Sequence, residues 1–251
     1  MQARLMLWLI AAAAAIVATL HMAPLFDLDE TIYAQTARDM QRAHSWLIPI
    51  ANGEPFFEKP PLFFDLLRIS FALFGENAFA ARLPSALATI ATALMLAATL
   101  RAAGRPQAAA GAALAFLSML QVQMLARAAI LDATLNLALA GAFCAYLLWL
   151  VRGGRHWLVW AAAASGLAVA IKGPVGAVVP AAAFLFERWL AGGIKEIVRF
   201  VRAFPWGAGL AAFLLTAAPL YLMLAMHEGL DFFVEFVIRH NLERALQPMQ
   251  G

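Results

Sequence analysis

Charged residues are scarce in this sequence. Only 13% of its 251 residues are Asp, Glu, Lys or Arg, and 64% are hydrophobic, with a mean hydropathy of +0.78. An ordinary soluble domain has about 25% charged residues, so long stretches of this chain do not face water. This excludes a disordered protein, a nucleic-acid-binding domain and a small secreted scaffold. Cysteine is nearly absent as well: Cys144 has no partner within the chain, so no internal disulfide can form.

What the sequence does contain is long apolar runs. Hydropathy predicts about seven membrane-spanning segments, since a spanning helix needs roughly 20 mostly apolar residues. The fifth and sixth are short and meet at Lys172-Gly173-Pro174, so they could form one tight helical hairpin. The first could instead be a signal peptide, because Arg4 precedes its Ala-rich core. The segments are residues 5–24, 79–100, 108–125, 133–151, 157–171, 175–190 and 207–226.

Basic residues predict the orientation of these segments. They concentrate near the N-terminus and in residues 101–105, 152–155 and 188–202. Because Lys and Arg are enriched in cytoplasmic loops, these segments and the N-terminus are expected in the cytoplasm. The long loop over residues 25–78 and the tail after residue 226 are then expected outside, in the periplasm or the extracellular space. The chain is thus expected to be a multi-pass protein of the cell inner (plasma) membrane.

The long outer loop is predicted to be folded and not a flexible tether. Residues 30–40 place apolar side chains at helical spacing with charges elsewhere, which is typical of an amphipathic helix at the bilayer surface. Residues 52–55 predict a turn, and residues 61–74 predict a second interfacial helix that begins at the Pro60-Pro61 pair. The expected fold is an all-α integral membrane bundle whose outer loop carries interfacial amphipathic helices.

Four ordered stretches resemble a known enzyme family. In their order and spacing they are similar to the polyprenyl-phosphate-sugar-dependent glycosyltransferases of the GT-C fold, among them bacterial aminoarabinose transferases and protein-mannosyltransferase-like enzymes. The resemblance covers essentially the whole chain. It implies that residues 1–251 form the N-terminal part of a GT-C-like bundle with a catalytic outer loop, because family members are longer, and that a C-terminal half is missing. The stretches are Asp29-Glu30-Thr31-Ile32-Tyr33-Ala34, Trp46-Leu47-Ile48-Pro49 with Asn52-Gly53, Phe57-Glu58-Lys59-Pro60-Pro61-Leu62, and residues 74–85.

The resemblance implies transfer of a sugar from a polyprenyl-phosphate donor to a lipid, glycan or protein hydroxyl at the outer membrane face. Such a reaction needs a base for the acceptor proton and cations for the departing phosphate. Asp29 matches the catalytic carboxylate of the family; by position alone it could simply cap a helix that begins at Glu30. Ile32 stands where aminoarabinose transferases usually have arginine, so the resemblance to that subgroup is incomplete.

The same motifs imply substrate-binding residues in the outer loop. Lys59 precedes two prolines at the level of the lipid headgroups, where it would bind phosphate; the alternative is an interfacial lysine that only snorkels. Glu58 would orient Lys59 or the sugar, or would be a solvated charge. Glu30, beside Asp29, is assigned to substrate binding with them.

Three further ionisable residues lie near the outer ends of predicted spans: Arg127, Asp132 and Lys172. Charges at membrane depth usually line a polar cavity or pair with each other. Asp132 could be a second carboxylate of the site and Lys172 a second phosphate or sugar contact. An Arg127–Asp132 pair could instead only tie two helix ends together. Arg82 is interpreted as a loop anchor at the start of its helix.

No cofactor is required by the sequence, although His240 with Glu58 could hold a divalent metal ion, and Asn241 and Arg244 could line the same cavity. The expected partners are the donor lipid, the acceptor and membrane lipids, without nucleic acid. The rival interpretation is a non-catalytic membrane protein, either a transporter subunit or a truncated inactive relic. A transporter would more often have broken helices that meet at the midplane and a paired repeat. Here the charges gather at one face and no repeat is evident.

Overall fold

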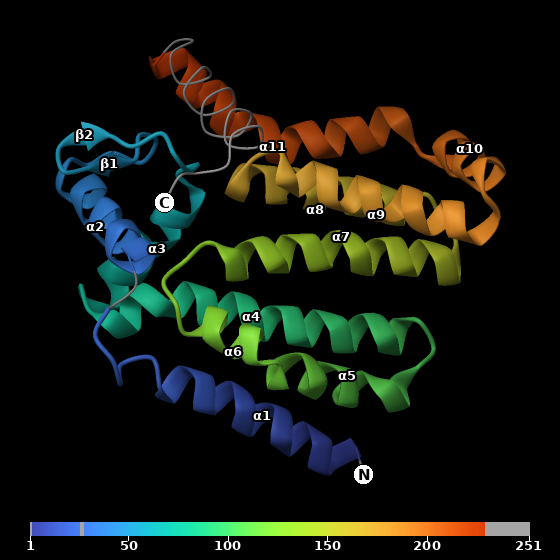
Figure 1. Ribbon diagram of the computed structural model, residues 1–251, viewed down its shortest axis with the longest axis horizontal. Coiled ribbons are helices and arrows are strands. Elements are labelled where there is room, and N and C mark those ends of the chain that lie inside the picture. The colour runs from blue at the N-terminus through green and yellow to red at the C-terminus, as the bar shows by residue number, and fades with distance from the viewer. Residues whose placement is uncertain (1, 26–27, 229–251) are drawn as a thin grey trace, which may run out of the picture.

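The computed structural model describes residues 2–25 and 28–228, and these residues are almost entirely helical (Figure 1). The elements in chain order are α1 (Gln2–Ala18), α2 (Leu28–Arg42), β1 (Ile50–Ala51), β2 (Glu54–Pro55), α3 (Leu62–Phe74), α4 (Ala78–Ala102), α5 (Pro106–Ser118), α6 (Leu120–Ala126), α7 (Asp132–Arg152), α8 (His156–Lys172), α9 (Val175–Gly192), α10 (Ile194–Ala203) and α11 (Trp206–Glu228).

Every apolar segment predicted from the sequence is largely helical, although the segment 5–24 is helical only to Ala18 and the segment 108–125 is divided between two helices. Four helices are long and apolar enough to cross a membrane, namely α4, α7, α9 and residues 206–226 of α11. The bent pair α5 and α6 is a fifth candidate, whereas the apolar parts of α1 and α8 are shorter. The helices lie side by side in one bundle (Figure 1). By length and composition, the described residues therefore contain four or five spans, fewer than the seven segments that hydropathy alone predicts.

The predicted span over residues 108–125 is not one straight helix. Met119 has an extended backbone (φ −66°, ψ 130°), which interrupts the helical hydrogen bonds between α5 and α6. The two helices meet at an angle of 72°. The break turns α6 out of the line of α5, and Arg127 follows directly at the end of α6.

Small residues allow the helices of the bundle to approach closely. At Gly166 in α8, a Cβ atom would lie 2.4 Å from the backbone oxygen of Phe213 in α11. At Gly176 in α9, a Cβ atom would lie 2.3 Å from backbone atoms of Ala168 and Val169 in α8. Helices α8 and α9 therefore form the tight hairpin that the sequence predicted at Lys172-Gly173-Pro174.

The outer loop is a folded unit at one end of the bundle, as predicted (Figure 1). Both predicted helices form, and their place at the bilayer surface stays a prediction: α2 buries Tyr33, Ala37 and Met40 in a cluster with Phe63 and Phe64 of α3. The predicted turn joins β1 to β2, where Asn52 and Gly53 both have positive φ angles, of 55° and 85°. The unit thus packs against the helix ends through a shared apolar core.

The opposite end of the bundle carries α10, which the sequence analysis treated only as part of a basic segment (Figure 1). Its charged residues follow one face and its aliphatic residues another. This periodicity is present in the sequence beside the basic charge of residues 188–202. The segment is an amphipathic helix and not a loop.

Candidate functional site

Asp132 and Lys172 meet at the end of the bundle that α2 and α3 cover. Asp132 is the first residue of α7 and Lys172 is the last residue of α8. The Lys172 Nζ donates a hydrogen bond of 2.5 Å to Asp132 Oδ1, and the two side chains are 34% and 36% exposed. The pair is therefore accessible from outside the bundle while it joins two helix ends.

Arg127 does not form the pair with Asp132 that the sequence left open. Its Nε donates to the Thr19 hydroxyl at 2.8 Å, and its Nη1 donates to the backbone oxygen of Gln123 at 3.1 Å and to the Gln123 side chain. Arg127 thus ties the end of α6 to the segment that follows α1. The end of α6, which Arg127 follows, lies at the same end of the bundle as the start of α7 (Figure 1).

A buried ion pair between Arg82 and Glu30 lies beneath this surface. The Arg82 Nε and Nη2 atoms donate to the two Glu30 carboxylate oxygens at 2.8 and 2.9 Å, and the side chains are only 4% and 1% exposed. Arg82 also donates to the backbone oxygens of Leu20, Ala23 and Pro24. The interpretation of Arg82 as a loop anchor is confirmed, because it fixes the connection between α1 and α2.

Glu30 connects two parts of the site through this ion pair. Its Oε1 atom also accepts a hydrogen bond of 2.8 Å from the backbone N–H of Ala129, which lies between α6 and α7. The Ser85 hydroxyl donates to the neighbouring backbone oxygen of Ile130 at 3.0 Å. Glu30 was expected to bind substrate together with Glu58 and Lys59. In the structure both of its carboxylate oxygens accept hydrogen bonds from the protein, and its side chain is buried.

Asp29, next to Glu30, is exposed on the site surface. Helix α2 begins at Leu28, so Asp29 lies in the first helical turn and not in the preceding cap position that the sequence allowed. The N-terminus of a helix carries partial positive charge, which stabilises an ionised carboxylate in the first turn. Because the next residue is held by Arg82, the backbone at Asp29 is well fixed.

Glu58 and Lys59 lie in the connection between β2 and α3. Glu58 is exposed and Lys59 is half-buried, whereas Pro60 and Pro61 are both buried. Two buried prolines limit the backbone to a narrow range of conformations. The structure therefore holds Lys59 on a rigid segment, as the sequence predicted.

Tyr33 of α2 is a buried residue that the sequence did not single out. Burial raises the pKa of the Tyr33 hydroxyl above its usual range, and the negative charges of Asp29, Asp132 and Glu58 raise this pKa further. These carboxylates come from α2, α7 and the loop before α3. The signal in the sequence was the spacing of four residues from Asp29 to Tyr33, which puts both on one face of a helix.

A second polar contact braces the outer unit on α3. The buried Arg68 guanidinium lies 3.8 Å from the centre of the Trp46 ring and bonds to the backbone oxygen of Ser45 and to Asp65, the latter at 3.2 Å. Burial raises the pKa of Asp65 to about 6, although the charge of Arg68 opposes this shift. The contact fixes the segment between α2 and β1 against α3.

A metal site finds no support in the part of the chain that the structure describes, since no three His, Cys, Asp or Glu side chains gather there in a suitable group. His240, Asn241 and Arg244 lie outside the described residues, so the suggested pairing of His240 with Glu58 has no structural account.

The fold matches solved membrane proteins. ArnT from Cupriavidus metallidurans, in a structure bound to undecaprenyl phosphate, superposes with a TM-score of 0.86 at 24% identity, over 95% of this chain and 44% of that chain. Its apo structure also gives a TM-score of 0.86, over 98% of this chain and 45% of that one. The likeness establishes an all-α membrane fold of the ArnT type, and this chain spans less than half the length of those proteins.

Sequence relatives agree with the fold. An undecaprenyl phosphate-alpha-4-amino-4-deoxy-L-arabinose arabinosyl transferase from Shewanella sediminis is 38% identical over 128 residues, which are 51% of this chain and 23% of the relative. One from Serratia proteamaculans is 30% identical over 201 residues, 74% of this chain and 36% of the relative. Residues 58–223, which run from Glu58 through the Asp132–Lys172 pair into α11, match a family profile over more than half of the chain. By that match the chain belongs to the dolichyl-phosphate-mannose-protein mannosyltransferase family.

Proposed function

We propose that this chain is the N-terminal part of a membrane glycosyltransferase. It transfers a sugar from a polyprenyl-phosphate donor to a hydroxyl of a lipid, glycan or protein acceptor. The relatives are named for undecaprenyl phosphate, which is the carrier proposed for this chain too. The observation that carries the proposal is the accessible Asp132–Lys172 ion pair at the end of the bundle that α2 covers, with Asp29 exposed in the first turn of α2. Bases and cations are both needed for this reaction, and both are present at one end of the bundle.

Asp29 is the general base in this proposal. As the acceptor oxygen attacks the anomeric carbon, its proton passes to the Asp29 carboxylate and the bond from that carbon to the phosphate oxygen breaks. The exposure of Asp29 and its place in the first turn of α2 support the role, because the helix N-terminus favours the ionised form that accepts a proton. Glu30 does not touch substrate here; it positions Asp29 through its bonds to Arg82 and Ala129.

The cations bind the phosphate of the donor. Lys59, before its two buried prolines, is the first contact, and Lys172 and Arg127 are further contacts. Lys172 can turn from Asp132 to a phosphate, since both members of the pair are about one-third exposed. Glu58 orients Lys59 or the sugar, and Asp132 is the second carboxylate of the site. Tyr33 remains protonated, because burial and the negative charges of Asp29, Asp132 and Glu58 raise the pKa of its hydroxyl.

The proposed location is the inner membrane, with the N-terminus in the cytoplasm and the outer unit of α2 and α3 on the far side. The basic segments support it, because residues 101–105, 152–155 and α10 lie at the end opposite to that unit (Figure 1).

The test of the catalytic role is the Asp29→Asn variant of the full-length protein. Transfer of a labelled sugar from undecaprenyl phosphate to acceptor lipid should be lost, whereas membrane insertion and thermal stability should match the wild type. Glu54→Gln, at the exposed tip of the β1–β2 hairpin, is the matched control and should retain activity. Normal transfer by Asp29→Asn would overturn the role of Asp29.

Donor binding is tested separately with Lys59→Ala. Its affinity for the donor lipid should fall, while Arg152→Ala at the other end of the bundle should bind normally. An unchanged donor affinity in Lys59→Ala would refute the phosphate contact. If reconstituted vesicles instead show substrate flux without a covalent product, the protein is a transporter and the enzymatic proposal fails.

A further inference from the structure

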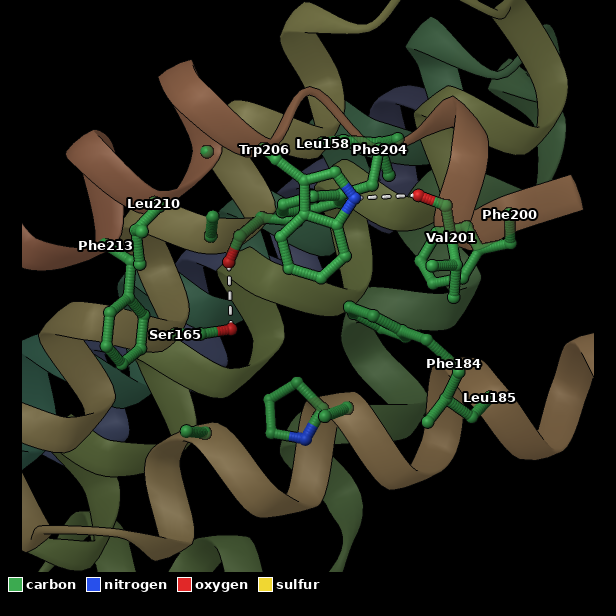
Figure 2. A pocket seen from close by; sticks show the side chains of 16 residues that line it. Leu158, Ser165, Phe184, Leu185, Phe200, Val201, Phe204, Trp206, Leu210 and Phe213 are labelled. Atoms are coloured by element: carbon green, nitrogen blue, oxygen red, sulfur yellow. Dashed lines mark hydrogen bonds between the residues drawn. The ribbon is translucent and has the colours of Figure 1, made fainter. Parts of the chain in front are cut away.

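A cavity lies between α8, α9, α10 and α11, away from the residues of the proposed active site. Its volume is about 350 Å³, within the range of small-molecule sites. Figure 2 shows aromatic side chains from α9, α10 and α11 around it, including Phe184, Phe204 and Trp206. Its lining includes Phe200 and Val201 of α10, the helix that lies at the end of the bundle opposite to α2 and α3 (Figure 1).

The walls of this cavity offer almost nothing to a polar ligand. The Ser165 hydroxyl already donates to the backbone oxygen of Ala161 at 2.9 Å, and the Trp206 Nε1 donates to the backbone oxygen of Val201 at 2.9 Å (Figure 2). The remaining lining is aliphatic or aromatic. A polar ligand would lose its hydrogen bonds to water without replacement, so only a hydrocarbon fits.

Helix α10 forms one edge of the cavity and is suited to the membrane boundary. Ile194, Val198 and Val201 are spaced along one face and are all exposed, at 69%, 41% and 39%. Lys195, Arg199 and Arg202 follow another face and are exposed too. A helix with one apolar and one basic face lies in the plane of the interface, with its apolar face among the acyl chains.

The basic face of α10 carries more positive than negative charge. Glu196 is its only acidic residue, and it forms ion pairs with Arg199 and with Arg188 at the end of α9. Arg188 is further neutralised by Glu187, through hydrogen bonds of 2.5 and 2.6 Å. Lys195 and Arg202 therefore supply the net positive charge beside the cavity, and each such residue near a bilayer favours anionic lipids.

We propose that this cavity binds an acyl chain of an anionic phospholipid, whose headgroup lies on the basic face of α10 at Lys195 and Arg202. The cavity and the cations supply complementary halves of one site: an apolar cleft between α8 and α11 for the acyl chain, and positive charge at the surface for the headgroup. The exposed Trp206 at the start of α11 marks the level of the headgroups, where tryptophan is enriched. This lipid site is separate from the donor site, since it lies at the other end of the bundle.

The experiment uses the full-length protein in nanodiscs that contain phosphatidylcholine and phosphatidylglycerol, with the lipids retained after gentle detergent extraction counted by native mass spectrometry. The wild type should retain phosphatidylglycerol in preference to phosphatidylcholine. Ala181→Phe, which fills the cavity from α9, should remove the retained lipid. Leu215→Phe, on an exposed face of α11 outside the cavity, is the control for added apolar volume and should behave as the wild type.

The headgroup contact is tested by a double variant, Lys195→Gln with Arg202→Gln. Its preference for the anionic lipid should fall roughly tenfold or more. Arg105→Gln with Arg152→Gln removes the same charge from the same end of the bundle away from α10, and should leave the preference unchanged. No retained lipid in the wild type, equal retention in Ala181→Phe, or equal loss of preference in both double variants would overturn the proposal. If another part of the full-length chain fills the cavity, the wild type will retain no lipid and the proposal fails.

Discussion

The contact between Arg82 and Glu30 is nearly closed to solvent, which distinguishes it from the surface ion pairs of the molecule. Arg82 and Glu30 each form several hydrogen bonds, so the surrounding protein groups stabilise both buried charges. A buried pair of this kind adds little net stability over apolar residues, but removal of one partner leaves the other charge buried and alone. Its importance is that it holds Asp29 beside residues 129–132.

Substitution of Arg82 should therefore be severe. Arg82→Ala is expected to destabilise the folded protein by about 3–5 kcal/mol, because Glu30 would remain buried without a counter-charge. Arg38→Ala is the matched control, since the Arg38–Glu76 pair spans 3.1 Å but is 30% and 39% exposed. It should cost about 0–1 kcal/mol. Thermal unfolding in detergent measures both, and equal shifts would contradict the assigned role of the buried pair.

Asp65 gives the outer unit a pH dependence. Its pKa in the folded protein, about 6, lies above the ordinary value of 3.8, so the folded state binds this proton more tightly than the unfolded state. The stabilisation from protonated Asp65 is therefore present at low pH and is lost as the pH rises through about 6.

The wild type should accordingly lose more stability between pH 5 and pH 7 than Asp65→Asn, a variant that cannot ionise at this position. Unfolding temperatures at the two pH values measure the difference. Glu54→Gln, which removes an exposed carboxylate from the same unit, should follow the wild type. An identical pH dependence in the wild type and Asp65→Asn would refute the shift.

At the scale of elements, the α8–α9 hairpin connects membrane packing to the site. Lys172 ends α8, and only Gly173 and Pro174 separate it from α9. Close contact of the two helices at Gly176 fixes the hairpin and with it the position of the Lys172 ammonium group. Apolar contacts set the spacing between α8 and α9. This spacing in turn determines where Lys172 lies relative to Asp132.

Gly176→Ala should push α8 and α9 apart, because its Cβ would meet backbone atoms of Ala168 and Val169 at 2.3 Å. Overpacking of this kind costs about 1–3 kcal/mol. Gly111→Ala in α5 is the control: no atom lies within 4 Å of the added Cβ, and alanine favours a helix by about 0.5–1 kcal/mol. Opposite changes in unfolding temperature are expected; a loss of stability in both variants would show that the close approach at Gly176 is not the cause.

At the scale of the whole molecule, the two ends of the bundle differ in chemistry. One end has the outer unit with its carboxylates and Lys59, whereas the other has basic connections and the amphipathic α10 (Figure 1). Such asymmetry orients a protein in its membrane, because Lys and Arg are retained on the cytoplasmic side.

Cysteine labelling measures this orientation directly. In a Cys144→Ala background, Glu54→Cys should react with a membrane-impermeant maleimide from outside the membrane. Gln107→Cys, which is exposed at the start of α5, should react only after permeabilisation. The inverse pattern would contradict the proposed topology and would put the catalytic surface on the cytoplasmic side.

Much of the architecture was predictable because its causes are local. Apolar runs marked the membrane helices, and helical periodicity in residues 30–40 and 61–74 marked α2 and α3. Residues 194–203 have the same helical periodicity, which would have predicted α10. The break at Met119 had no local signal, since neither proline nor glycine lies in α6 or in the last turn of α5.

The sequence by itself determined that this is a helical membrane protein with a folded outer unit, because burial of apolar side chains and the satisfaction of backbone hydrogen bonds in lipid leave few other solutions. Only the tertiary structure decided which charges meet. Arg82 pairs with Glu30 across 52 positions, Lys172 pairs with Asp132 across 40, and Arg127 bonds to Thr19 and not to Asp132. Such pairings depend on how the helix ends are arranged in space, and that arrangement follows from the packing of small residues along whole helices, which no local pattern records.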